Sequence, residues 1–351
     1  MTLAATNPGL GWRTAMAANI NDMTSHHPVT GQRGRKRRGR VVNQSTHIAR
    51  LIVLASAVAL AACGTSTGTA AAPSPPPTTS SPTSSATAES ESAQPMSGTA
   101  VAGHIHNLVY NGRTLLIGTH EGLWGQAPDS NPVLVSVEPF DVMGLTNAGN
   151  RWLASGHPGV GMDAPTDLGL LQSTDEGQTW AELSLGGEVD FHRLAASSAV
   201  IVGLNAHDGR LLRSDNGGTA WTDLGVPGLY DLAVDPSDPA VIVATTENGP
   251  VRSIDSGASF QPVATAPLLA LLAWTSGALY GAGVDGQIHV STDEGVTWKP
   301  LGSLPSQPSA LAAMGTTVAA LVGDTIHESV DGAKSFTPRL TELGAHSAHN
   351  S

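Results

Sequence analysis

One eight-residue pattern recurs five times in the second half of this chain and constrains its architecture. Each copy starts with Ser, has Asp or Asn at its third position and ends on Trp or Phe. Successive copies start 41, 39, 38 and 38 residues apart, at Ser173, Ser214, Ser253, Ser291 and Ser329. A period near forty residues, filled with several short apolar strands, is typical of a β-propeller.

The residue types of the pattern suit a tight turn. Ser and Asp side chains hydrogen-bond the backbone of their own turn, Gly takes a positive φ, and the final ring buries a large apolar surface. The pattern resembles the Asp-box (BNR-repeat) propellers, which include sialidases, sortilin-like receptors, xyloglucanases and photosystem assembly factors. The resemblance covers residues 101–340 and implies that the boxes lie at the blade periphery, opposite the active-site face. We therefore interpret the third-position residues as structural: Asp175, Asn216, Asp255, Asp293 and Asp331.

The strand candidates predict an all-β, six-bladed β-propeller over residues 101–340, with four strands in each blade. The first blade lacks the repeat. Residues 341–351 are expected to form a C-terminal tail. The six blades are expected to begin near His104, Asp141, Glu188, Leu229, Leu268 and Ser309.

The N-terminal part predicts export and lipid anchoring. Residues 1–62 look like an extension and a lipoprotein signal peptide, because basic residues precede an apolar run, 51–62, that is shorter than the ~20 residues a membrane-spanning helix needs. The run ends in Leu-Ala-Ala-Cys63-Gly, which resembles a bacterial lipobox and implies a lipidated Cys63 at the outer leaflet of the cell membrane. Residues 63–100 are rich in Ser, Thr, Pro and Ala and are expected to form a disordered tether.

Charge argues against two classes of partner. Eight of the 17 basic residues and one of the 29 acidic residues precede Cys63, which leaves 9 and 28 after it and a formal charge of −19 with His neutral. Such a domain is not expected to bind nucleic acid or to contact an anionic membrane directly. Cations and protein or glycan partners remain open, and we expect a monomer.

Five histidines are predicted to converge at the mouth of blades 1–3, where inner strands begin and second strands end. Imidazole with carboxylate suits Zn²⁺ or Cu²⁺. Glu121, Asp163 and Asp190 are the expected carboxylates of such a site, as ligands or as partners of the ligands. The alternative is that these histidines are polar fillers of a water-lined channel. The predicted metal ligands are His104, His106, His120, His157 and His192.

Enzymatic alternatives are weaker on sequence grounds. Sialidase chemistry needs an arginine triad, yet the predicted propeller has seven Arg, only Arg193 lies on an inner strand, and the Arg-Ile-Pro motif is missing. Glycoside hydrolysis needs two facing carboxylates. The candidates are Asp141, Asp163, Glu188, Asp190 and Asp231.

Short sequence segments of blade 1 show a further resemblance. Its segments His104-Ile-His106 and Thr119-His-Glu-Gly-Leu-Trp124 are similar to a group of bacterial, typically actinobacterial, Asp-box lipoproteins with glycosyl hydrolase-like names. No activity follows from that similarity. The leading expectation is therefore an envelope binding or scaffold module, with a divergent glycoside hydrolase and an assembly or sorting factor as alternatives.

Overall fold

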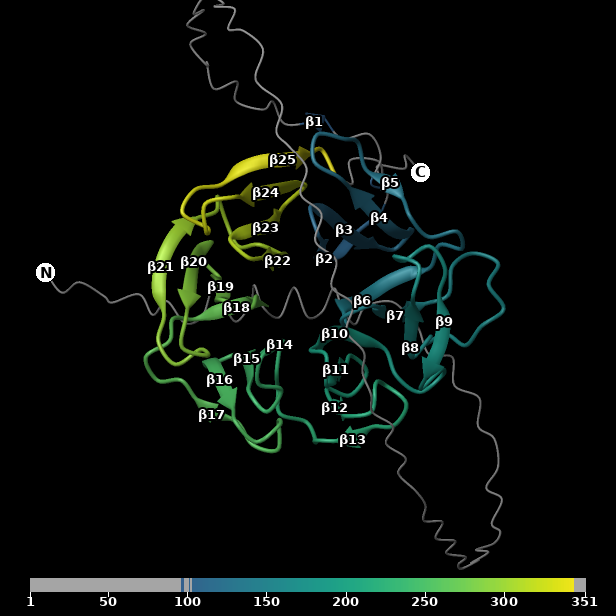
Figure 1. Cartoon of the computed structure of the whole chain (residues 1–351), viewed down its shortest axis with the longest axis horizontal. Helices are drawn as coiled ribbons and strands as arrows, with labels where there is room; N and C mark the ends of the chain where they lie inside the picture. Colours follow the sequence, from purple (N-terminus) through teal and green to yellow (C-terminus); the bar gives the residue numbers. More distant parts are fainter. Residues whose placement is uncertain (1–95, 98–100, 102, 344–351) are drawn as a thin grey trace, which may run out of the picture. The chain divides into compact units, whose positions relative to one another are not determined.

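A computed structural model describes residues 96–97, 101 and 103–343, and these residues form a six-bladed β-propeller (Figure 1). They contain strands and turns and no helix that could cross a membrane. The predicted signal peptide, Cys63, most of the tether and the tail after 343 lie outside the described residues. The all-β, six-bladed prediction is confirmed.

Each blade is an antiparallel meander built from consecutive strands. Blade 1 comprises β2 (Ile105–Asn111), β3 (Thr114–Thr119), β4 (Gly122–Gln126) and β5 (Val133–Leu134). Blade 2 comprises β6 (Asp141–Asn147), β7 (Trp152–His157), β8 (Leu170–Ser173) and β9 (Ala181–Ser184). Blade 3 comprises β10 (Phe191–Ala196), β11 (Ile201–Asn205), β12 (Leu211–Ser214) and β13 (Thr222–Asp223).

The second half of the ring follows the same plan. Blade 4 comprises β14 (Asp231–Val234), β15 (Ile242–Thr246), β16 (Gly249–Ser253) and β17 (Gln261–Pro262). Blade 5 comprises β18 (Leu269–Trp274), β19 (Leu279–Gly283), β20 (Gln287–Ser291) and β21 (Lys299–Ser303). Blade 6 comprises β22 (Ala310–Met314), β23 (Thr317–Val322), β24 (Thr325–Ser329) and β25 (Thr337–Thr341).

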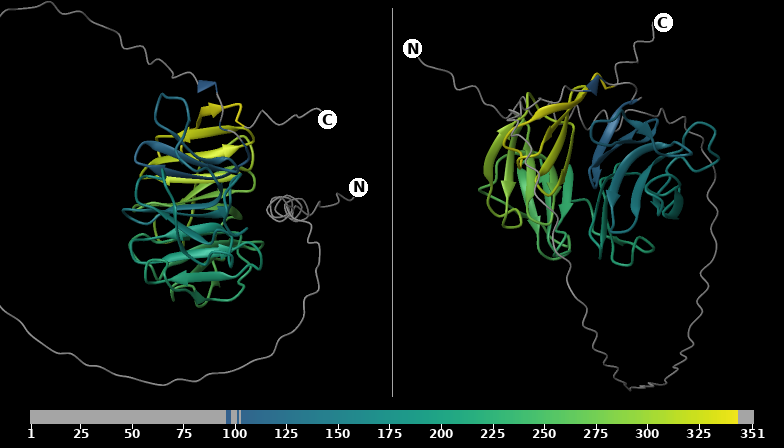
Figure 2. Two further views of the ribbon diagram at one scale, coloured as in Figure 1. Left: turned by 90° about the vertical axis from the view of Figure 1, so that its right-hand side faces the viewer. Right: turned by 45° about the horizontal axis from the view of Figure 1, so that its top comes forward.

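The hydrophobic core lies between neighbouring blades. Leu116 and Leu123 of blade 1 pack with Phe140 and Val142 of blade 2, and comparable clusters join the other blades. The first strand of each blade lies nearest the ring centre, and the edge-on view shows blade 1 beside blade 6 (Figures 1 and 2). The inner strands β14 and β18 are covered on both sides, and most of their side chains are buried without alternation.

The five copies of the sequence pattern, here called the repeat turns, connect the third and fourth strands of blades 2–6. In the first, Ser173 Oγ donates to Asp175 Oδ1 at 2.8 Å and accepts from the backbone N of Gly177 at 2.9 Å. The backbone N and Oγ1 of Thr179 donate to the Asp175 carboxylate at 2.9 and 2.5 Å. Gly177 has φ +89°, a conformation that favours glycine, although Ala333 takes the equivalent position of the fifth turn at φ +62°.

One repeat turn has an amide in place of the carboxylate and also lacks one of the hydrogen-bond donors. Where the others have a carboxylate, the side-chain oxygen of Asn216 accepts only from the backbone N of Ala220 and the hydroxyl of Ser214. Ala220 lacks the hydroxyl that would donate to a second carboxylate oxygen. This turn therefore lacks both the second carboxylate oxygen and the hydroxyl that would donate to it.

The sheet of blade 6 differs from the expectation of four strands in each blade. It has a fifth strand, β1 (Met96–Ser97), which pairs in parallel with β25 in the register Met96↔Leu340. An outermost strand offers unpaired backbone groups along its edge, and β1 pairs with part of that edge on β25. Strand pairing at this edge was not visible in the sequence, because two residues carry no periodic signal.

Side chains connect blades 6 and 1 in addition to β1, which precedes blade 1 in the chain and pairs with β25 of blade 6. Arg339 of β25 donates to the Gln126 side chain at 2.5 Å and to its backbone O at 3.0 Å, and pairs with Glu328. Tyr110 Oη donates to Glu328 at 2.6 Å, and burial together with that carboxylate raises the pKa of the Tyr110 phenol. Apolar residues of β2, β3, β22 and β25 pack beneath this network.

Candidate metal centre

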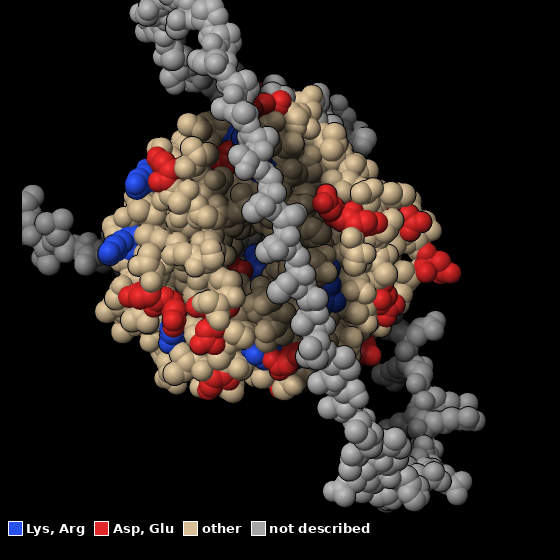
Figure 3. Space-filling view, viewed as in Figure 1, with Lys and Arg blue, Asp and Glu red and all other residues tan. Residues whose placement is uncertain are grey.

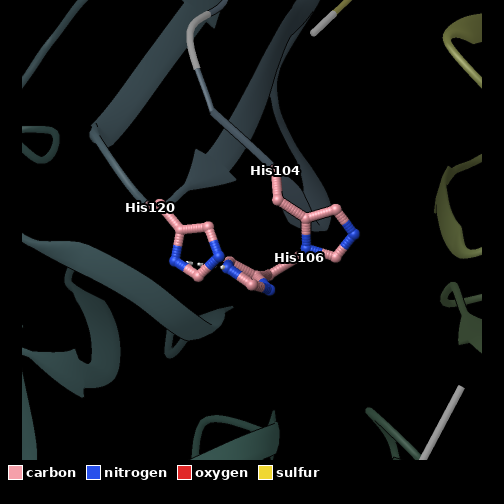
Figure 4. A group of neighbouring side chains, drawn as sticks. All are labelled: His104, His106 and His120. Carbon is pink, nitrogen blue, oxygen red and sulfur yellow. Dashed lines mark hydrogen bonds between the residues drawn. The ribbon is translucent and has the colours of Figure 1, made fainter. Parts of the chain in front are cut away.

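Three histidines of blade 1 meet where β2 begins and β3 ends (Figure 4). His104 directly precedes β2, His106 lies on it, and His120 follows β3. The backbone N of His120 donates to the carbonyl of His104 at 3.3 Å, which holds the two segments together. One ligand-type atom from each of the three lies within 4.8 Å of the others.

The spacing of these imidazoles is close to that of metal ligands. Nε2 of His106 and Nδ1 of His120 are 3.3 Å apart, and their ring centroids are 4.4 Å apart. Two nitrogens bound tetrahedrally to Zn²⁺ at ~2.0–2.1 Å are separated by ~3.3 Å. The His104 ring lies 4.9 Å from that of His106. The blade 1 trio thus provides a pair of nitrogens at coordination distance with a third imidazole beside it.

Asp141, at the start of β6 in blade 2, contacts two histidines of the blade 1 trio. Its Oδ2 accepts from Nδ1 of His120 at 2.8 Å, and its Oδ1 lies 3.4 Å from Nε2 of His106. Burial alone would raise the pKa of the Asp141 carboxyl, but its interactions with His106 and His120 outweigh it and lower that pKa. The carboxylate is therefore charged and adjacent to both nitrogens.

Burial also keeps one imidazole in the form that binds metal. It lowers the pKa of His106, against the opposing attraction of Asp141 and with additional repulsion from His120 and His104. The neutral ring with an available lone pair is the ligand form. A metal ion would replace the proton that His120 shares with Asp141, and binding would release it.

The other two predicted histidines form a separate group between blades 2 and 3. His157 ends β7, Asp190 precedes β10 and His192 lies on β10, and one ligand-type atom from each lies within 4.8 Å of the others. Asp167 lies 3.6 Å from Nδ1 of His157, and its other oxygen is 3.1 Å from Nε2 of His207. The five histidines are thus placed in two groups instead of one.

A β-bulge positions one histidine of each group. The register of β2 on β3 skips a residue at His106, and that of β10 on β11 skips one at His192. Bulges redirect side chains and are frequent beside active sites. Both side chains line the central cavity, whose volume is about 290 Å³ and whose wall also includes Arg193 and Asp231. Nothing in the local sequence signals either bulge.

The remaining predicted carboxylates are not gathered into one site. Glu121, Asp163 and Glu188 are exposed. Asp231 is buried, accepts from the backbone N of Leu272 at 2.8 Å and lies 3.4 Å from Nε of Arg193. Burial raises the pKa of Asp231 despite the nearby guanidinium. Sequence reasoning gave weight to Asp163 in the blade 2 insertion, whereas Asp167 of the same insertion contacts the histidines.

The surface in Figure 3 agrees with the acidic composition. Asp and Glu side chains form patches around the outer part of this face, Lys and Arg are few, and the middle is hollowed. A cation approaching such a surface is attracted rather than repelled.

Comparison with known proteins shows the fold. Neither a protein-family model nor a curated protein matches the sequence. Among solved structures, a GH74 xyloglucanase from Xanthomonas campestris is similar at 16% identity and a TM-score of 0.47, over 68% of this chain and 45% of that one. A chain of a nidogen/laminin complex is similar at 13% identity and a TM-score of 0.50, over 64% and 92%. An ancestral GH74 enzyme is similar at 14% identity and a TM-score of 0.44, over 67% and 38%. The chain spans less than half the length of the two GH74 proteins.

Proposed function

We propose that this protein is an exported binding module that holds a transition-metal ion, Zn²⁺ or Cu²⁺, on the blade 1 trio. The supporting observation is the 3.3 Å separation of His106 Nε2 and His120 Nδ1, with His104 adjacent. Imidazole ligands suit both ions, and Cu²⁺ is expected to bind more tightly by the usual order of divalent affinities. Asp141 either completes the ligand set or orients the two rings.

The accessibility of the blade 1 trio favours presentation of the ion to a partner. The His120 side chain is 37% exposed, whereas that of His106 is 10% exposed. An ion held by three imidazoles keeps a further coordination position, which a ligand atom of a protein or glycan partner can take. The net negative charge of the chain after Cys63 favours capture of cations.

The proposal also includes a lipid anchor at the membrane and a structural role for the repeat turns. Lipidation of Cys63 would hold the propeller at the outer leaflet of the membrane through the tether, and the repeat turns would be Asp-boxes that stabilise the blades. Metabolic labelling with a palmitate analogue tests the first part. We expect label on the wild-type chain and none on Cys63→Ala; equal labelling of both would exclude lipidation at this position.

The metal proposal is tested on the purified full chain. After dialysis against Zn²⁺ or Cu²⁺ and then metal-free buffer, elemental analysis should find bound metal, and His106→Ala with His120→Ala should remove it from this site. His327→Gln, on β24 away from the trio, is the matched control and should retain the wild-type content. Equal metal content in the double variant and the wild type would overturn the proposal.

Asp231 supports glycoside hydrolysis as a second candidate. A buried carboxyl with a raised pKa on the wall of a cavity is suited to act as a general acid. The reaction also needs a second carboxylate at ~5–9.5 Å. Hydrolysis of aryl glycosides that is abolished in Asp231→Asn and unaffected by chelator would favour this function over the metal-binding one.

A further inference from the structure

A second group of metal-ligand side chains lies in blades 2 and 3, apart from the blade 1 trio. It consists of His157, Asp190 and His192. The Asp190 and His192 side chains are only 3% and 6% exposed, while that of His157 is 27% exposed. His157 is therefore the most exposed member of the group.

Hydrogen bonding fixes which nitrogen of His157 faces the group. Nδ1 of His157 lies 2.9 Å from the backbone O of Thr166, which can only accept, so this nitrogen carries the proton. In the neutral ring Nε2 then presents a lone pair, and it lies 3.5 Å from Oδ2 of Asp190. Two acceptors facing each other at this distance repel unless a proton or a cation lies between them.

His192 and Asp190 are buried with polar atoms that lack a protein partner. Within the described residues, the two ring nitrogens of His192 make no hydrogen bond, and neither does Oδ1 of Asp190. Nε2 of His192 is 2.6 Å from Oδ2 of Asp190, but the two groups are not aligned as donor and acceptor. Buried polar groups normally have partners, so the convergence of these atoms points to a bound cation.

We infer that His157, His192 and Asp190 form a second Zn²⁺ site. Two imidazoles and one carboxylate with a remaining open position form a recurrent zinc ligand set. The 3.5 Å between Nε2 of His157 and Asp190 is near the ~3.3 Å expected of tetrahedral ligands, and the His192 ring would have to move ~0.7 Å from Asp190 to match it. Imidazole ligands exclude Ca²⁺ and Mg²⁺, which take oxygen ligands.

The surroundings supply the outer partners that metal-bound histidines usually have. Thr166 O and Asp167 lie next to Nδ1 of His157, at 2.9 and 3.6 Å. His207 approaches the other oxygen of Asp167 at 3.1 Å. A carbonyl or carboxylate on the far nitrogen fixes the tautomer and makes the ligand more basic. This site does not depend on the blade 1 trio, since the two share no residue.

The experiment counts Zn²⁺ ions in the full chain with ZnCl₂ alone as the probe. His106→Ala with His120→Ala leaves the second group intact and should retain one tightly bound ion. Adding Asp190→Asn and His192→Gln to that variant should remove it. Thermal unfolding checks the fold, and Zn²⁺ should raise the Tm of the first variant and leave that of the second unchanged.

The outcomes separate the two sites. If the variant with His106→Ala and His120→Ala binds no ion, the proposal of a second site is wrong. The Zn²⁺ content of the wild type then tests the blade 1 trio alone. An ion that survives Asp190→Asn with His192→Gln also overturns the assignment, and would indicate that Asp190 and His192 form only a carboxylate–imidazolium pair. One ion lost with each pair of substitutions supports both sites.

Discussion

The repeat turns and the mouth of blades 1–3 both use Asp with hydrogen-bonding partners, but only the repeat turns are self-contained. In each turn the Ser hydroxyl and the Asp or Asn oxygen bond to groups of the same eight residues. At the mouth, buried atoms without a hydrogen-bond partner occur on Asp141, Asp167, Asp190, His192 and Arg193, and among the described residues no repeat turn contains one. A saturated turn has nothing to offer a ligand, whereas unsatisfied groups gain partners by binding.

The largest expected effect is a loss of metal affinity that occurs at the mouth and not in the repeat turns. His106→Ala with His120→Ala removes two of three imidazoles from the blade 1 trio. We expect the affinity of that site for Zn²⁺ to fall by more than roughly 100-fold, the upper end of what outer partners contribute. Calorimetry on the full chain measures it. Asp175→Ala, in a repeat turn, should leave that affinity unchanged; a matching loss there would erase the distinction.

The next effect concerns the carboxylate that joins blade 2 to the blade 1 trio. Asp141→Asn keeps the size of the side chain but removes the charge next to His106 and His120. We expect roughly a 10–100-fold loss of Zn²⁺ affinity, as for other outer partners of metal-bound histidines. Asn147→Asp, at the other end of β6, is a charge-altering control. Unchanged affinity in Asp141→Asn would show that the histidines are held by the fold alone.

The repeat turns respond in stability instead. Ser291 is 1% exposed, and its Oγ accepts from the backbone N of Gly295 and donates to Asp293, both at 2.8 Å. Ser291→Ala leaves a buried N–H unpaired, at a cost of about 1–3 kcal/mol in the free energy of unfolding. Urea unfolding measures this, with exposed Thr292→Ala as the control. Zn²⁺ affinity should not change, and a change would connect the turns to the sites.

The smallest effect is the acid response of the turn carboxylates. The Thr179 hydroxyl, its backbone N and Ser173 lower the pKa of Asp175 to about 2, and the equivalent groups lower the pKa of Asp255 to about 2. Because these folded-state pKa values lie below the usual value of 3.8 for Asp, the carboxylates stabilise the fold above pH ~4, and that contribution is lost as the pH falls toward 2.

Replacing carboxylates by amides tests this response. Asp175→Asn with Asp255→Asn should flatten the decline of Tm between pH 4 and 2, measured by circular dichroism. The turn that starts at Ser214 has Asn216, which does not titrate, in place of this carboxylate, and so shows that the fold accepts an amide at this position. A decline as steep as that of the wild type would assign the acid sensitivity to other carboxylates.

The ring was predictable because its information is local, and the mouth was not because its geometry is set between blades. Each repeat turn is specified within eight residues, so the five copies predicted five blades, and the strand candidates before the first copy added the sixth. The division of the histidines depends on bulges at His106 and His192 and on the approach of Asp141 and Asp167 from other segments. Strand candidates alone place residues on a face and do not say which of them touch.

The contacts between blades 6 and 1 also bear on whether the order of the blades along the chain could be changed. Val101 and Leu343, near the two ends of the propeller, belong to one apolar cluster beside the Arg339 network. Every blade is a complete meander, so a circular permutant that links these ends and opens the chain between β13 and β14 would leave all the blade strands with their own sheets. In that permutant blades 1–3, which carry the two histidine groups, would follow blades 4–6 in chain order, and the same groups would be encoded at the opposite end of the polypeptide.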